Sequence, residues 1–148
     1  MDDADRALRE QGEALAAAVT AAVPGWVQRC VDAHVRGLDA TEAGRRAAAD
    51  VGPELHALLT ADVDDQRANP LAVVRAAVRH PTAVLQQAGI APPAHRSRFD
   101  EEHFPDDPYG LSPMTWRDID EDLHEPGITW GAMKAYVHKQ RHRSEGPQ

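Results

Sequence analysis

The sequence predicts an all-α protein, a single-domain helical bundle of about six helices with a Pro-rich strap and a C-terminal helical hairpin. Hydrophobic residues make up 42% of the chain, and alanine is the commonest of them, whereas only three Trp, two Tyr and two Phe add bulk. Alanine is the best helix former, whereas strands favour β-branched and aromatic residues. A chain of 148 residues is also long enough for one domain with a core, but too short for two independent cores.

Residues 1–67 form the Ala-rich part of the predicted bundle. Three amphipathic helices are expected here, over residues 3–22, residues 26–38 and residues 39–59. Pro24-Gly25 is expected to end the first helix, and Gly52-Pro53 to kink or split the third. Asp39 and Glu42 have the spacing of a capping box at the start of the third helix.

Residues 68–90 are predicted to form short basic helices. Asn69-Pro70 supplies an N-cap followed by proline at the first helical position, which is typical of a helix start. His80-Pro81 is expected to interrupt this segment, and Gly89 to end it.

Residues 91–113 contain five prolines and many acids, so we expect an extended acidic strap in place of a long helix. Its larger apolar side chains are expected to pin the strap to the helical body. They are Phe99, Phe104, Tyr109 and Leu111.

Residues 114–143 are predicted to form a helical hairpin, followed by a tail over residues 144–148. Ser112-Pro113 supplies an N-cap and first position for its first helix. The turn is expected at residues 124–127, with Thr129 capping the last helix. Apolar side chains at helical spacing form the inner faces, namely Trp116, Ile119, Leu123, Trp130, Met133 and Tyr136 or Val137.

The chain carries a net charge of −8, but its charge alternates in sign along the sequence. Residues 1–66 and 99–126 are acidic, whereas residues 67–98 and 127–148 are basic. Such a distribution argues against general nucleic-acid affinity and favours recognition by complementary patches.

A cytoplasmic location is expected, without membrane insertion. The N-terminus lacks the basic and apolar regions of a signal peptide, and no apolar run approaches the roughly 20 residues that span a bilayer. The single cysteine, Cys30, excludes an internal disulfide and a Cys-rich zinc site.

The candidate binding residues lie on the outer face of the last predicted helix. They are Lys134, His138, Lys139, Arg141, His142 and Arg143. A secondary basic patch is expected from Arg75, Arg79, Arg96 and Arg98. The acidic strap is able to fold over either basic group, which would match charge within the molecule.

His138 and His142 are four residues apart on one helix face, a spacing that presents two imidazoles to one metal ion. A zinc ion would need further ligands, which His124, Glu125 or the strap would have to supply. The alternative is a pair of exposed histidines in a basic segment, and this is the interpretation we adopt: no metal and no cofactor are expected.

No nucleophile lies in a recognisable catalytic motif, so no catalytic residue is assigned and the chain is not expected to be an enzyme. Cys30 and His34 are one helical turn apart, a spacing that can produce a thiolate. Buried cysteines, however, mostly behave as small apolar residues.

Two resemblances bear on function. The segments NPLAVVRAAVRHPTAVLQQAGIAPPAHR, FPDDPYGLSPMTW and EPGITWGAMKAYVHKQR resemble a group of small uncharacterised actinobacterial proteins, which implies no activity. The segment TWRDIDEDL followed by MKAYVHKQR is similar to the helix-turn-helix of sigma-factor region 4. That resemblance implies a recognition helix over Met133 to Arg141, although HEPGITWGA is a longer turn and acids crowd the first helix.

The leading hypothesis is a non-enzymatic adaptor or regulatory protein that acts by protein–protein interaction. The alternative is a DNA-binding transcriptional regulator that uses the C-terminal helices. The sequence does not identify the partner or the oligomeric state.

Overall fold

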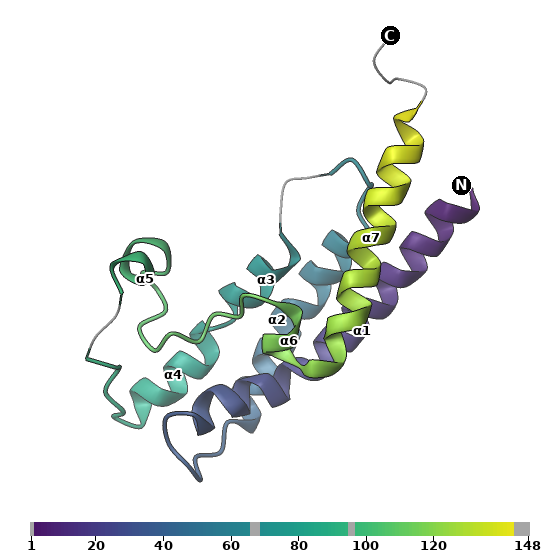
Figure 1. Ribbon diagram of the computed structural model, residues 1–148. Coiled ribbons are helices and arrows are strands. Elements are labelled where there is room, and N and C mark those ends of the chain that lie inside the picture. The colour runs from purple at the N-terminus through teal and green to yellow at the C-terminus, as the bar shows by residue number, and fades with distance from the viewer. Residues whose placement is uncertain (1, 66–68, 95–96, 144–148) are drawn as a thin grey trace.

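Figure 1 shows the computed structural model of the chain, which describes residues 2–65, 69–94 and 97–143. Within these ranges the chain is helical without strands, which confirms the predicted all-α class. The elements are α1 (Asp3–Asp32), α2 (Thr41–Leu59), α3 (Pro70–Ala76), α4 (Arg79–Gln87), α5 (Arg98–His103), α6 (Trp116–Ile119), the 3-10 helix η1 (Glu121–Leu123) and α7 (His124–Arg141). Arg96 and the predicted tail over residues 144–148 lie outside the described residues.

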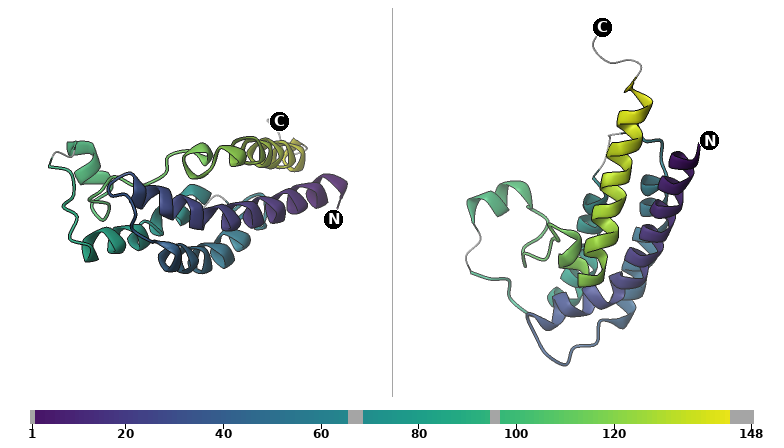
Figure 2. Two further views of the ribbon diagram at one scale, coloured as in Figure 1. Left: turned by 90° about the horizontal axis from the view of Figure 1, so that it is seen from below. Right: turned by 45° about the vertical axis from the view of Figure 1, so that its right-hand side comes forward.

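The central helix of the bundle is α1. It packs against α2, α4 and α7, and Figure 1 and Figure 2 show it running antiparallel to α2 and α7. Buried side chains repeat along it at four-residue spacing, namely Leu15, Val19, Val23, Val27 and Val31. The start of α1, the end of α2 and the end of α7 therefore meet at one end of the molecule.

Pro24-Gly25 does not end the first helix, so the prediction of two helices in this part was wrong. A proline in a helix interior costs about 3 kcal/mol because it lacks the N–H and crowds the preceding turn. Val23, Trp26 and Val27 around it are buried in the core. Burial of side chains of this size contributes roughly 1.5–3 kcal/mol each, enough to offset the proline.

The second helix is also continuous, because Gly52-Pro53 lies inside α2 without dividing it. Ala47, Val51, Leu55 and Leu59 are buried on one face of α2, on both sides of the proline. Tertiary packing therefore overrides the same local signal in both long helices.

Capping side chains predicted two helix starts before α4, one at Asp39 and one at Asn69, and the one at Asn69 is confirmed. The Asn69 side chain accepts the N–H of Leu71 at 2.9 Å, as expected of an N-cap. The capping box at Asp39 and Glu42 was wrong. Asp39 instead accepts the N–H and the O–H of Thr41, and Glu42 pairs with arginines of its own helix.

The break between α3 and α4 falls at Ala77-Val78, three residues earlier than predicted. The chain leaves α3 after Ala76 and re-enters a helix at Arg79, so Pro81 sits in the first turn of α4, where an N–H is not required. Gly89 follows α4 with a φ of 73°, a left-handed conformation that glycine adopts without strain and that ends the helix as predicted.

The strap over residues 91–113 contains the short helix α5, and its described part after α5 runs back to α6 (Figure 1). Tyr109 is buried and donates its hydroxyl to the carbonyl of Ile90, and Leu111 packs against the core. Phe99 is 55% exposed and stacks on His103, so its predicted role in pinning the strap was wrong.

The two C-terminal helices begin at other residues than predicted. Thr115, not Ser112-Pro113, caps α6, and it forms a capping box with Asp118. Residues 124–127 are the first turn of α7, so they are not a turn between helices and Thr129 is not a cap. The first helix of the expected hairpin is a single turn, and it packs less against α1 than α7 does.

By length and composition, α1 is the one helix among the described residues that is apolar enough to cross a membrane, with a mean hydropathy of 1.2 over its most apolar stretch. A core helix of a soluble protein or a signal sequence passes the same test. In this structure 39% of that stretch is buried inside the bundle.

Candidate functional site

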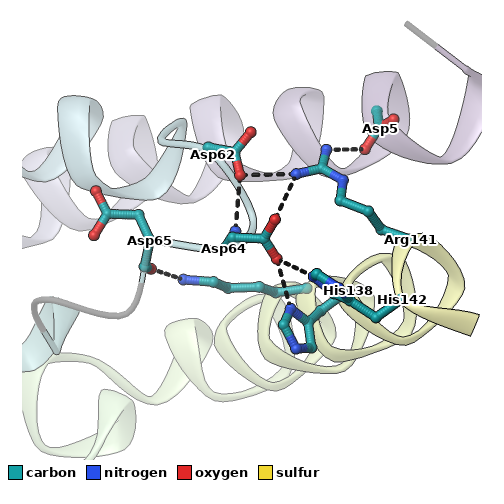
Figure 3. A network of polar contacts seen from close by, with 8 residues as sticks. Asp5, Asp62, Asp64, Asp65, His138, Arg141 and His142 are labelled. Atoms are coloured by element: carbon teal, nitrogen blue, oxygen red, sulfur yellow. Dashed lines mark hydrogen bonds and ion pairs between the residues drawn. The ribbon is translucent and has the colours of Figure 1, made fainter. Parts of the chain in front are cut away.

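The end of the bundle where α1, α2 and α7 meet carries the densest network of polar contacts among the described residues, drawn in Figure 3. The chain leaves α2 into residues 62–65, which we call the acidic loop. Val63 is buried and holds the loop against the bundle. Asp62 accepts the N–H of Asp64 at 2.9 Å, a local turn that leaves the carboxylates of both residues available to α7.

Arg141 joins three segments at this end of the molecule. Its Nη1 atom donates to Asp62 at 2.8 Å and to Asp64 at 3.2 Å, and its Nη2 atom lies 3.4 Å from Asp5 of α1. Because its guanidinium presents several donors in a fixed plane, one arginine is able to hold carboxylates from three directions.

His138 and His142 contact the same oxygen of Asp64. The Nδ1 atom of His138 lies 2.8 Å from Oδ1, and the Nε2 atom of His142 lies 2.7 Å from it. Hydrogen bonds from His142, then from Arg141 and His138, lower the pKa of Asp64 to about 2, against the opposing effect of desolvation.

Four of the six predicted binding residues thus face the acidic loop. The fourth is Lys134, whose ammonium donates to the carbonyl of Asp65 at 3.0 Å and lies 5.2 Å from the Trp130 ring. Lys139 and Arg143 are exposed, and neither forms an ion pair with another residue that the structure describes.

The secondary basic patch comes together only in part among the described residues, because Arg75 and Arg79 line one hollow beside the strap and Arg98 lies outside it. Arg75 donates to the carbonyl of Pro113, Arg79 pairs with Asp50 of α2, and Arg98 pairs with Glu102 of its own helix. Asp106 and Asp107 of the strap line that hollow as well, and the buried Asp107 accepts backbone N–H groups of the strap itself. Lys134 and Arg141 of the last helix meet the acidic loop and not the strap.

The acidic loop was not among the candidate sites predicted from the sequence. The third candidate ligand for His138 and His142 is Asp64, not His124, Glu125 or the strap. The available signal was the cluster of three aspartates directly after the last buried residue of α2. Its significance depends on the antiparallel course of α2 and α7, which spacing within one segment does not reveal.

A second feature is the face of α7 that points away from the bundle. Ile128 and Tyr136 are exposed by 55% and 57%, and the exposed Ala132 and Ala135 lie between them. Ala132 and Tyr136 follow Ile128 by four and eight residues, and Ala135 follows Ala132 by three, so all four share one side of the helix. The same side continues into Lys139, and the exposed Arg143 follows just after the end of α7. We call these six residues the outer face of α7.

Cys30 does not have the character of a nucleophile. Burial raises the pKa of its thiol to about 12, with the negative charge of Asp107 acting in the same direction. A thiol with such a pKa stays protonated at neutral pH, in agreement with a structural role.

No known protein family, curated protein or solved structure matches the chain.

Proposed function

We propose that the protein is a non-enzymatic adaptor or regulatory protein that binds another protein through the outer face of α7. The observation that carries the proposal is the exposed pair Ile128 and Tyr136, with small residues between them, on a helix whose opposite side is buried against α1. An aromatic and an aliphatic side chain flanking alanines offer a ridge and shallow gaps to an approaching helix.

The charge of the same face specifies the partner. Lys139 and Arg143 extend the apolar stripe, and they are not neutralised by the acidic loop, unlike Arg141. The partner that fits is therefore an amphipathic helix with an apolar stripe followed by acidic residues. Complementary charges of this kind set orientation and speed association more than they add affinity. A cytoplasmic location is part of the proposal, and the free thiol of Cys30 is compatible with it.

Site-specific photocrosslinking tests this proposal. A photoreactive residue at Ala132 is expected to capture a partner in the native cell, and the same residue at the exposed Ala57 of α2 is not. The purified partner should then bind the wild-type chain and lose binding to Tyr136→Asp. Charge reversal by Lys139→Glu with Arg143→Glu should weaken binding, because it removes the complementarity to acidic residues.

Three results would overturn the proposal. They are equal capture from Ala57, binding that Tyr136→Asp leaves unchanged, and a crosslinked product that contains only copies of this chain. Tyr136 and Ala132 are exposed, so the variants should retain wild-type helicity, which circular dichroism checks.

A DNA-binding regulator is the second candidate, supported by the outward Lys139 and Arg143. It is less favoured because Arg141 already binds carboxylates, and the aspartates beside it repel phosphate. Affinity for duplex DNA that falls steeply with salt, and a shallower salt dependence in Lys139→Ala, would favour this candidate over the adaptor.

A further inference from the structure

We infer that Asp64, His138 and His142 form a binding site for a divalent transition metal ion such as Zn²⁺. Each residue offers one ligand atom, and these atoms lie within 4.8 Å of one another. The two imidazole nitrogens already converge on one carboxylate oxygen, Oδ1 of Asp64. An ion that replaces the two hydrogen bonds would find three ligands on one side and water on the other.

The ligand types select the class of metal ion. Imidazole and carboxylate suit Zn²⁺ and Co²⁺, whereas Ca²⁺ and Mg²⁺ prefer oxygen ligands throughout. With Zn–N and Zn–O bonds near 2.0–2.2 Å, ligand atoms in a tetrahedral site lie about 3.3 Å apart. The present contacts of 2.7 and 2.8 Å need to open by roughly half an ångström. Partly exposed side chains are able to make that adjustment by rotation.

The surroundings fix the carboxylate before an ion arrives. Arg141 holds the other oxygen of Asp64, Oδ2, at 3.2 Å, and the backbone N–H of Asp64 is held by Asp62. Such second contacts orient a ligand and commonly raise metal affinity. Asp5 and Asp62 also lie against Arg141, so carboxylates outnumber the guanidinium around the site.

The geometry also predicts a consequence for stability. His138 belongs to α7 and His142 is the residue that caps its end, whereas Asp64 belongs to the loop that follows α2. A bound ion would join these two segments and stabilise the folded state by mass action. The two histidines point toward the acidic loop and not toward the outer face of α7. This inference therefore does not depend on the proposed function.

Titration of tag-free, full-length protein with Co²⁺ tests the site, because Co²⁺ reports its coordination by visible absorption. We expect one ion per chain and a higher melting temperature. His138→Ala and His142→Ala should each lower affinity by more than about 100-fold, since losing even a supporting residue of a metal site costs about 10–100-fold. Asp64→Asn keeps the size of the side chain but removes its charge, and it should also weaken binding strongly.

His56→Ala and His103→Ala are the matched controls, because they remove exposed imidazoles elsewhere and should leave the titration unchanged. Circular dichroism of each variant separates loss of ligands from loss of fold. Absence of stoichiometric binding at millimolar Co²⁺ would overturn the inference. Binding that survives His138→Ala or His142→Ala, or that Asp64→Asn does not affect, would do the same.

Discussion

Gly127 and Gly131 lie one turn apart on α7, but their surroundings differ. A Cβ atom at Gly127 would lie 2.2 Å from Cδ1 of Trp116, whereas a Cβ at Gly131 would meet no heavy atom within 4 Å. The indole of Trp116 thus packs directly on the backbone of α7. No side chain larger than hydrogen fits at residue 127 without moving that ring.

Gly127→Ala is therefore expected to lower the free energy of unfolding by about 1–3 kcal/mol through overpacking. Gly131→Ala is the control, and it should raise the free energy of unfolding by roughly 0.5–1 kcal/mol, since alanine favours the helix over glycine. Urea unfolding followed by far-UV circular dichroism measures both. Effects of the same sign in the two variants would contradict the close contact with Trp116.

Single residues were predictable where their role is local. Asn69 acts through the N–H of Leu71, two residues away, and the sequence pattern predicted that cap correctly. Phe99 and Tyr109 looked equivalent in the sequence, yet only Tyr109 is buried. Its hydroxyl reaches the carbonyl of Ile90, a partner that depends on how the strap folds back.

At the level of elements, the helices were predictable but their ends were not. Pro24 and Gly52-Pro53 are strong local signals for a break, and buried residues on both sides override them. At the start of the C-terminal helices, Ser112 and Thr115 both offer a capping side chain. Thr115 is used because Asp118 reciprocates through the backbone N–H of Thr115.

Local patterns also did not predict which elements distant in the sequence would pair. Alternating charge predicted that basic residues would meet an acidic segment of the chain, and the strap was a candidate. Arg141 instead meets the acidic loop, because the antiparallel course of α2 and α7 brings their ends together. Spacing within a segment revealed the two histidines, but Asp64 is 74 residues from His138.

Arg141→Ala is expected to loosen this end of α7 without unfolding the molecule. Arg141 contacts the start of α1 and two carboxylates of the acidic loop, but these pairs are exposed, so their loss acts locally. Amide hydrogens in residues 60–65 and in the last turn of α7 should exchange faster in the variant, as measured by mass spectrometry.

Lys139→Ala removes an exposed cation from the same turn that makes no ion pair with a described residue, and it serves as the control. Exchange should stay at the wild-type rate in this variant. Raising the salt concentration should also shrink the difference between Arg141→Ala and the wild type, because salt screens exposed ion pairs. Equal exchange rates in the two variants would show that Arg141 does not hold the loop.

For the whole molecule, the structure indicates one core shared by the helices that pack on α1. Leu55 of α2, Leu85 of α4 and Ile119 of α6 are all fully buried, and they belong to the same apolar cluster. The sequence predicted a single core from chain length. It did not predict that one continuous helix of 30 residues would organise that core, because it divided α1 at Pro24.

A shared core predicts that the molecule unfolds in one cooperative transition. Trp26, Trp116 and Trp130 report on α1, α6 and α7, whereas far-UV circular dichroism reports on all helices, including α3 and α4. The two signals should therefore give the same urea midpoint. Separate midpoints would mean that the helices around α4 fold independently of those around α7.

Leu55→Ala and Leu85→Ala sharpen this prediction, because they remove buried side chains from different helices of the one core. Each should lower the free energy of unfolding by about 2–5 kcal/mol, the usual cost of a cavity at a buried leucine. Each should also shift the fluorescence and circular dichroism midpoints together, with the slope of the transition unchanged. If Leu85→Ala shifted only the circular dichroism signal, α4 would belong to a separate folding unit, and the core centred on α1 would be smaller than the packing indicates.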